Sequence, residues 1–334
     1  MTRPTMKDVA EVAGVSFKTV SRVVNDESGV SAPMAKRVHE AIDQLGYRRN
    51  HSAHALRSRS SVGTIGVVHA DITNPFSAEV HAAFERYTAE RGSVLLAGSA
   101  GEDPTRQDQL VETFAERRVD GLVIIPSDDT PGPALQRELD RHTPIVFVDR
   151  EPDTDADVVM SEHRGGAAAA TRHLLEHGHR HIGFLGSSER TFSVQQRRTG
   201  FDDAMRSVER GVSTVRTDLT DAAMAAAAVH ELFADRRSSP TALFVAQNLA
   251  AAGAIRALHQ RGLAHEIALV AYDHLESADV VDPAITTVPQ DTEALGRIAA
   301  EALFSRIGGD RRAPQRHIVP VSIVPRGSGE IRPQ

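Results

Sequence analysis

Basic and hydroxyl-bearing side chains are concentrated in a short segment near the amino terminus. Lys18 and Arg22 can donate hydrogen bonds to guanine edges, and Phe17 offers an apolar face to a thymine methyl group. Short polar side chains, which suit phosphate oxygens and position a protein on a duplex without reading its sequence, accompany them: Ser16, Thr19, Ser21, Asn25 and Ser31. These residue types predict contact with double-stranded DNA.

Three short helices are expected to position these side chains. Thr5 and Asp8 form a capping box ahead of apolar residues at helical spacing, and Gly14 ends that helix. Ser16 is suited to cap a second helix with a valine-lined inner face, and Ser31 precedes a third. Two helices that meet at a tight turn are typical of a helix-turn-helix, whose second helix enters the major groove. The alternative is a small three-helix unit with an incidental basic face.

Charge is distributed unevenly along the chain. Residues 1–60 carry ten Lys and Arg against six Asp and Glu, whereas residues 61–334 carry 28 against 39, which gives a net charge of −7 for the chain. A basic module on an acidic body suits a polyanionic partner for the first segment only. The chain has no cysteine, no apolar run near the ~20 residues of a membrane span and no apolar segment typical of a secretory signal. We therefore expect a cytoplasmic protein without disulfides.

The pattern changes at residue 62, where short β-branched runs begin to alternate with amphipathic stretches. The expected strands are 64–68, 94–97, 121–125, 145–148, 182–185, 242–245, 267–271 and 319–324. The expected helices include 77–91, 103–117, 164–178 and 249–262, and the alanine run 222–228 is typical of a close-packed helix. This alternation predicts an α/β core of two lobes, each a parallel sheet wound on both sides by helices. Ligands of such sheets bind at the carboxyl ends of the strands.

The amino-terminal segment strongly resembles the LacI/GalR family of bacterial repressors. The family pattern D-V-A-x-x-A-G-V-S-x-x-T-V-S-R-V-x-N is filled at every fixed position from Asp8 to Asn25, and Tyr47 completes the family's L-G-Y ending. The resemblance continues through Thr73-Asn74-Pro75-Phe76 to Arg326-Gly327-Ser328. It implies that Thr5 and Tyr47 join the DNA-contacting residues named above.

The resemblance also gives the basic linker, residues 50–61, a role. In this family the segment folds into a hinge helix when two subunits meet over the operator, and Asn50, Ala53 and Leu56 fall on its DNA-facing side. Leu56 is then the apolar wedge that opens a base step in the minor groove. Without the resemblance, a leucine in such a linker is more simply a packing residue. Two subunits that read the half-sites of a palindromic operator imply a homodimer.

For the remainder of the chain the resemblance implies a core like the periplasmic sugar-binding proteins, with a small effector held between the lobes. The implied boundaries are 1–49 for the DNA-binding domain, 50–61 for the hinge and 62–334 for the core. Within the core, residues 62–161 and 291–322 form one subdomain, and residues 162–290 and 323–334 form the other.

Candidate effector ligands follow from the chemistry of a polyol, whose vicinal hydroxyl groups donate and accept together and so suit carboxylates with a guanidinium. The candidates are three charged residues that also align with ligand positions of the family, one aromatic ring and two amides: Asp149, Arg197, Asp273, Phe76, Gln247 and Gln290. Phe76 can stack on a sugar or base ring, although a core role competes with this interpretation.

Two departures from the family pattern leave the identity of the effector open. The chain has Glu162-His163 where the family often has Asp-Asn, and Gln247-Asn248 where it often has Asn-Asp. Because carboxylates around the cleft have moved or been lost, pentoses, hexoses and nucleosides all remain candidates. Release of DNA by the effector (induction) is the commoner family arrangement, and corepression is the alternative.

Catalytic and metal chemistry find little support in the sequence. The four histidines between His173 and His181 lack a carboxylate or thiolate at ligand spacing. Nucleophile-elbow, zinc-protease, phosphate-loop and dinucleotide motifs are missing, and the three lysines all lie in the first sixty residues. We expect no cofactor, no metal and no enzyme. The rival functions are a solute-binding protein for uptake, a sugar-metabolising enzyme, and an activator or effector-independent regulator of the same fold.

Overall fold

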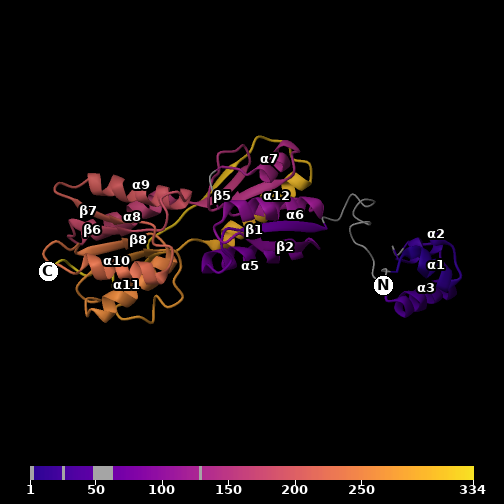
Figure 1. The fold of residues 1–334 in the computed structure, drawn as a ribbon, viewed down its shortest axis with the longest axis horizontal. Coiled ribbons are helices and arrows are strands. Elements are labelled where there is room, and N and C mark those ends of the chain that lie inside the picture. Colours follow the sequence, from indigo (N-terminus) through magenta and orange to yellow (C-terminus); the bar gives the residue numbers. More distant parts are fainter. Residues whose placement is uncertain (1–3, 25–26, 48–62, 128–129) are drawn as a thin grey trace. The chain divides into compact units, whose positions relative to one another are not determined.

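The computed structural model describes residues 4–24, 27–47, 63–127 and 130–334. The chain separates into two compact units, residues 1–61 and 62–334, and Figure 1 labels most of their helices and several of their strands. The predicted hinge helix lies outside the described residues, as do four predicted DNA-binding residues: Asn25, Asn50, Ala53 and Leu56. Within the described part of the chain, no helix has both the length and the hydropathy needed to cross a membrane.

Three helices form the first unit: α1 (Met6–Ala13), α2 (Phe17–Val24) and α3 (Ala32–Leu45). The predicted capping box of α1 is present, because the Thr5 amide donates to Asp8 Oδ2 at 2.7 Å and the Asp8 amide donates to Thr5 Oγ1 at 3.4 Å. These hydrogen bonds lower the pKa of Asp8. Gly14 ends α1 with a φ of 61°, a conformation that glycine adopts without steric cost. Ser16 Oγ caps α2 by accepting from the Thr19 amide at 3.1 Å.

A cluster of valines holds the three helices together. Val9, Val20 and Val38, one from each helix, are fully buried. Burial of Val20 and Val23 on one side of α2 fixes which of its side chains face outward. The sequence thus predicted both the order of these helices and the inner face of α2.

The second unit begins with a sheet of parallel strands in the order β11-β5-β4-β3-β1-β2. Its strands are β1 (Thr64–His69), β2 (Val94–Ser99), β3 (Gly121–Ile124), β4 (Ile145–Val148), β5 (Asp157–Ser161) and β11 (Arg316–Val319). Its helices are α5 (Pro75–Ala89), α6 (Pro104–Glu116), α7 (Pro133–Asp140) and α12 (Thr292–Ile307). We call this part the first lobe. Its central strands β3 and β4 are buried throughout, as expected for a parallel sheet covered on both faces.

The second lobe is another parallel sheet, in the order β10-β9-β8-β6-β7. Its strands are β6 (His181–Leu185), β7 (Val212–Arg216), β8 (Ala242–Val245), β9 (Ala268–Tyr272) and β10 (Thr286–Val288). Its helices are α8 (His163–Glu176), α9 (Phe192–Arg206), α10 (Ala222–Leu232) and α11 (Asn248–Gln260). Helices α8 and α9 pack on one face and α10 and α11 on the other (Figure 1). The predicted α/β core of two parallel lobes is confirmed.

The predicted last strand, residues 319–324, is wrong. The strand in this region is β11, which ends at Val319, and residues 320–323 form an irregular connection from the first lobe to the second. Val324 then pairs with Thr287 through two backbone hydrogen bonds of 2.7 and 3.1 Å. Pro320 explains the early end, because proline has no amide hydrogen to donate to a neighbouring strand. Strands β5, β7, β10 and β11 are additional to those predicted.

Gly200 allows helices α8 and α9 to approach each other closely. A Cβ atom at Gly200 would lie 2.1 Å from the carbonyl oxygen of Arg164, so the backbones must separate to accommodate it. We expect Gly200→Ala to lower the free energy of unfolding by about 2 kcal/mol, because overpacking costs ~1–3 kcal/mol or more and exceeds the ~1 kcal/mol that alanine adds to a helix. Urea unfolding followed by circular dichroism measures this change. Gln195→Ala, on the exposed side of the same helix, is the control, and equal stability of both variants would contradict the prediction.

A buried histidine at the end of β1 makes the first lobe sensitive to acid. Burial and the neighbouring His81, whose Nδ1 lies 3.0 Å from His69 Nε2, lower the pKa of His69 from 6.5 to about 4. The unfolded chain therefore binds a proton at this site below pH 6.5, whereas the folded protein stays neutral there until about pH 4. The stability due to neutral His69 is present above pH 6.5 and is lost as the pH falls, by ~2 kcal/mol at pH 5.

This pH dependence can be tested by substitution. We expect urea unfolding of the His69→Asn variant to show a smaller loss of stability between pH 7 and pH 5 than the unchanged protein. His259→Asn, at an exposed position of α11, should leave the loss unchanged. Equal pH profiles for all three proteins would show that His69 does not contribute.

Candidate functional site

The outward face of α2 carries the residues predicted to read DNA. Phe17 leaves 47% of its surface exposed, although the aromatic ring is apolar, and Lys18 is also exposed. Arg22 is half-buried, and its guanidinium group lies close to Gly29: a Cβ atom added to this glycine would be 3.4 Å from Arg22 Nη1. The helix therefore presents two cations, Lys18 and Arg22, on the side opposite its valines, with the exposed ring of Phe17 at the boundary of the two sides.

The other predicted DNA-binding residues of the first unit have mixed roles. Ser16 and Thr19 are hydrogen-bonded to each other through their hydroxyl groups at 2.9 Å, at the first turn of α2. Thr5 Oγ1 donates to Asp8 at 2.8 Å, and Ser31 is exposed without capping α3 through its side chain. Tyr47 packs against the valine cluster, and Ser21 is half-buried. Of these polar side chains, Ser16 and Thr19 lie at the amino-terminal end of α2 and Ser21 lies within it.

The core places all six predicted effector ligands around one cavity. The cavity has a volume of about 40 Å³ and is lined from both lobes. Its lining includes Phe76, Asp149, Arg197, Gln247, Asp273 and Gln290. Phe76 also packs in the hydrophobic core of the first lobe and is 9% exposed. The volume holds a few water molecules, so a larger ligand requires side chains or lobes to move apart.

Asp149 and Asp273 occupy equivalent positions in the two lobes. Asp149 follows β4 and Asp273 follows β9, each at the carboxyl end of a central strand. Both have left-handed backbones, with φ of 67° and 77°, and each amide donates to a carbonyl of the neighbouring strand at 3.0 Å. Non-glycine residues adopt this conformation at a cost, and such residues cluster at functional sites. The strained backbones bring a carboxylate from each lobe to the same cavity.

Arg197 is fixed from several sides. Its Nη1 donates to the Ala246 carbonyl at 2.7 Å, and its Nη2 lies 3.4 Å from Asp273 Oδ1. The guanidinium also lies over the ring of Tyr272, 3.9 Å from its centre, in a cation–π contact. Arg197 is 3% exposed, so its charge is compensated almost entirely by protein groups.

His163 links two of these groups and was not among the predicted ligands. Its Nε2 donates to the Asp149 carbonyl at 2.9 Å, and its Nδ1 lies 3.4 Å from Arg197 Nη2. Burial and the charge of Arg197 lower the pKa of His163, which keeps the ring neutral and able to accept from Arg197. The signal was present in the sequence, where Glu162-His163 departs from the family's Asp-Asn.

A second residue that sequence reasoning did not select connects the lobes. Asn248, at the start of α11, donates through Nδ2 to Asn74 Oδ1 at 2.8 Å. Asn74 caps α5 of the first lobe by accepting from the Phe76 amide at 3.0 Å. Asn248 belongs to the second departure from the family pattern, Gln247-Asn248, and Asn74 to the motif before Phe76. Both departures therefore fall at contacts between the lobes.

Three polar atoms of the predicted ligands are buried without a hydrogen-bond partner: Asp149 Oδ1, Arg197 Nε and Gln290 Oε1. Gln290 uses its amide nitrogen to donate to Asp273 Oδ1 at 2.7 Å, which leaves its oxygen as a free acceptor. Buried polar groups in native proteins are nearly always hydrogen-bonded. Two unused acceptors and one unused donor at the same cavity therefore favour a ligand that supplies the complementary groups.

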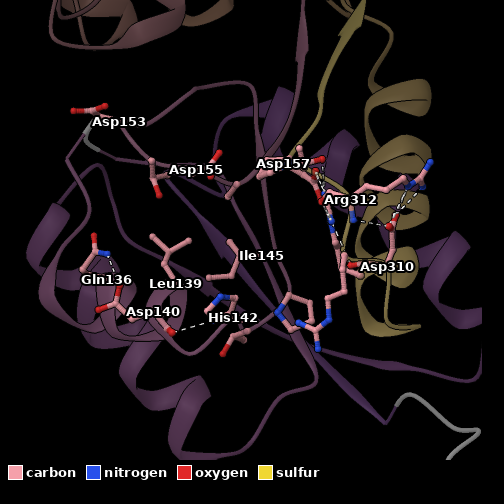
Figure 2. A pocket seen from close by; sticks show the side chains of 18 residues that line it. Gln136, Leu139, Asp140, His142, Ile145, Asp153, Asp155, Asp157, Asp310 and Arg312 are labelled. Carbon is pink, nitrogen blue, oxygen red and sulfur yellow. Dashed lines mark hydrogen bonds and ion pairs between the residues drawn. The ribbon is translucent and has the colours of Figure 1, made fainter.

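A larger hollow of about 770 Å³ lies in the first lobe at the amino-terminal ends of β4 and β5, whereas the small cavity lies at the carboxyl ends of the strands. Figure 2 draws interactions for several of its charged side chains, including Arg312 and Asp310, and none for Asp153 and Asp155. Arg306 forms two hydrogen bonds with Asp157, of 2.6 and 2.8 Å, and Arg312 binds Asp310 at 2.7 Å. None of the buried side-chain atoms described as unpaired lines this hollow. Buried polar atoms without a partner therefore distinguish the smaller cavity from this hollow.

The histidine cluster of the second lobe anchors the carboxyl-terminal segment. His173 Nε2 lies 2.6 Å from Glu330 Oε1, and His179 Nε2 lies 2.7 Å from the Ile331 carbonyl. Burial lowers the pKa of His179. Among the residues with described positions, no group of three or more His, Asp or Glu could hold a metal ion.

Comparison with known proteins bears on both units. Residues 5–50 match the model of bacterial regulatory proteins of the lacI family, and residues 171–329 match a periplasmic binding protein-like domain. The HTH-type transcriptional repressor PurR of Aliivibrio fischeri (strain MJ11) is 32% identical over 309 residues, which cover 91% of each protein. PurR of Vibrio vulnificus (strain CMCP6) is 31% identical over 326 residues, 94% of this chain and 96% of that protein.

The chain belongs to the lacI family of bacterial regulatory proteins. Solved structures agree with this assignment. The lac repressor dimer bound to operator and the anti-inducer ONPF has a TM-score of 0.83 and 27% identity. The match covers 98% of this chain and 99% of the lac repressor chain. The CelR–cellobiose complex has a TM-score of 0.70 and 28% identity, with 98% of this chain and all of the other covered. This lacI-family member is a DNA-binding transcriptional regulator with a small-molecule effector, and it is not an enzyme.

Proposed function

We propose that this protein represses transcription by binding a palindromic operator as a homodimer, and that an effector in the small cavity between the lobes releases it. The observation that carries the proposal is α2, whose cations Lys18 and Arg22 lie opposite a buried valine face and whose Phe17 is exposed beside them. A lac repressor with the same fold is bound to its operator as a dimer. Because its target is chromosomal DNA, we place the protein in the cytoplasm, on the nucleoid.

We assign three kinds of DNA contact. Phe17, Lys18 and Arg22 face base edges in the major groove. The phosphate-contacting group comprises Thr5, Ser16, Thr19, Ser21, Asn25, Ser31 and Tyr47. In the linker, which is not described structurally, Asn50, Ala53 and Leu56 are proposed to enter the minor groove, with Leu56 as the wedge. The proposed boundaries are 1–49 for the DNA-binding domain, 50–61 for the hinge and 62–334 for the core. Within the core, we propose one subdomain of residues 62–161 and 291–322 and another of residues 162–290 and 323–334.

We assign the effector to Asp149, Arg197 and Asp273, with Phe76, Gln247 and Gln290 around it. A sugar, sugar derivative or nucleoside fits these groups, and the related CelR is complexed with cellobiose. The effector must bind one arrangement of the lobes more tightly than the other to have any influence on DNA binding. Release of the operator is the direction that we propose.

Selection from a library of random duplexes tests the operator. The full-length protein should enrich a palindromic sequence at physiological salt, and fluorescence anisotropy should then show at least a hundredfold preference for that sequence over random duplex, as specific DNA-binding proteins do. A selection that enriches no sequence would refute the repressor function. Addition of the effector to the bound complex should lower the anisotropy; an increase in affinity would make it a corepressor instead.

A further inference from the structure

Both guanidinium groups at the small cavity are already occupied by protein groups. Arg150 forms two hydrogen bonds with Glu102, each of 2.7 Å, and one with the Pro126 carbonyl. Arg197 is held by Asp273 and the Ala246 carbonyl, as described above. Arg150 Nε also lies 3.7 Å from Asp149 Oδ2. The positive charges of both arginines are therefore compensated within the protein, although Arg197 Nε has no hydrogen-bond partner.

Carboxylates outnumber guanidinium groups around the same cavity. Its lining contains four carboxylates, Asp71, Glu102, Asp149 and Asp273, against Arg150 and Arg197. Asp149 is 5% exposed, and its Oδ1 makes no hydrogen bond. The unused amide oxygen of Gln290 is a further acceptor. The two unpaired acceptors thus require hydrogen-bond donors from a ligand, the unpaired Arg197 Nε requires one acceptor, and the excess of carboxylates disfavours negative charge.

We infer that the effector is an uncharged molecule that donates hydrogen bonds to Asp149 and Gln290, and that the cavity rejects phosphorylated forms of the same molecule. The inference rests on the proposed function in taking this cavity as the effector site. Hydroxyl groups of a sugar or nucleoside can supply both the donor that Asp149 Oδ1 lacks and the acceptor that Arg197 Nε lacks. A phosphate carries about −1.5 to −2 charges and oxygens that mainly accept hydrogen bonds, so it would add like charge beside the carboxylates without satisfying them.

Matched pairs of compounds test this inference on the full-length protein. The probes are ribose and ribose 5-phosphate, glucose and glucose 6-phosphate, and adenosine and adenosine 5′-monophosphate, compared by thermal shift and by isothermal titration calorimetry. We expect the unphosphorylated member of at least one pair to bind at least tenfold more tightly than its phosphate. A ligand that binds the folded state raises the apparent melting temperature by mass action.

Asp149→Asn identifies the responsible group. Asparagine tolerates the left-handed backbone at this position, so the variant should fold, and loss of the charged acceptor should weaken the selected ligand by about 10- to 100-fold. Asp140→Asn, in the larger hollow of Figure 2, is the matched control and should bind normally. Equal affinity of both variants would remove Asp149 from the site.

The remaining outcomes also decide the inference. Tighter binding of any phosphorylated member than of its free partner overturns it, and so does a screen in which no unphosphorylated compound binds. Failure of the proposed function would appear elsewhere, as the absence of an enriched operator in the duplex selection. A protein that binds free sugars but no operator would keep this inference and lose the repressor function.

Discussion

Arg22→Ala is expected to weaken binding to the selected operator by roughly 5- to 150-fold for each half-site, while effector binding is unchanged. A bidentate contact between an arginine and a guanine is worth ~1–3 kcal/mol of discrimination, which gives this range. Binding to random duplex should fall much less, because that binding depends mainly on the number of phosphate contacts. Fluorescence anisotropy with both duplexes separates the two effects.

Two further variants show whether the effect is due to base reading. Arg22→Lys keeps the charge but loses the planar fork of donors, so specificity should fall while binding to random duplex stays near normal. Lys36→Ala removes an exposed charge of α3, whose Nζ lies 3.9 Å from Glu40, and should preserve specificity. Circular dichroism confirms that each variant is folded. Operator affinity of the Arg22→Ala variant within threefold of the unchanged protein would refute the assignment of α2 as the recognition helix.

Arg197→Ala is expected to abolish release of the operator by the effector while the effector-free protein still binds DNA. Arg197 is buried against Asp273 and Tyr272, so its loss removes a ligand contact and also leaves a buried carboxylate without its cation. Removal of one partner of a buried ion pair costs ~3–5 kcal/mol. We therefore expect the free energy of unfolding of the core to fall by about this amount.

The two consequences of this substitution can be separated. Arg197→Lys retains the charge beside Asp273 and should restore much of the stability, but it cannot reproduce the planar contacts and should still lose the effector response. Arg198→Ala is the control, because the neighbouring Arg198 binds Glu189 and Asp202 away from the cavity. A normal response to the effector in the Arg197→Lys variant would make Arg197 a structural residue and not a ligand.

The fold was predictable where one local signal determined one local structure. The capping box at Thr5 and the glycine at position 14 specify the ends of α1 without help from the rest of the chain. The additional strand β7 lacks such a signal: Val212–Arg216 is mostly polar, lies at an edge of its sheet and is largely exposed. The error at residues 319–324 has the same origin, since an apolar run interrupted by proline forms a connection and not a strand.

The candidate site was predictable only as far as the family pattern reached. Asp149, Arg197 and Asp273 could be selected because charged side chains at strand ends suit a polyol and match family positions. His163 could be recognised as a departure, but its contact with Arg197 spans 34 positions and depends on how α8 and α9 pack together. The contact between Asn74 and Asn248 spans 174 positions and leaves no trace in local spacing.

The bond between Asn74 and Asn248 has a practical consequence for experiments. It joins two neutral amides across the lobes, and the other contact described between them, from His163 to the Asp149 carbonyl, also involves a neutral ring. Salt screens such contacts little, whereas affinity for DNA falls steeply as counterions compete for phosphates. Potassium chloride can therefore be used to adjust operator affinity into a measurable range with little effect on these two contacts between the lobes.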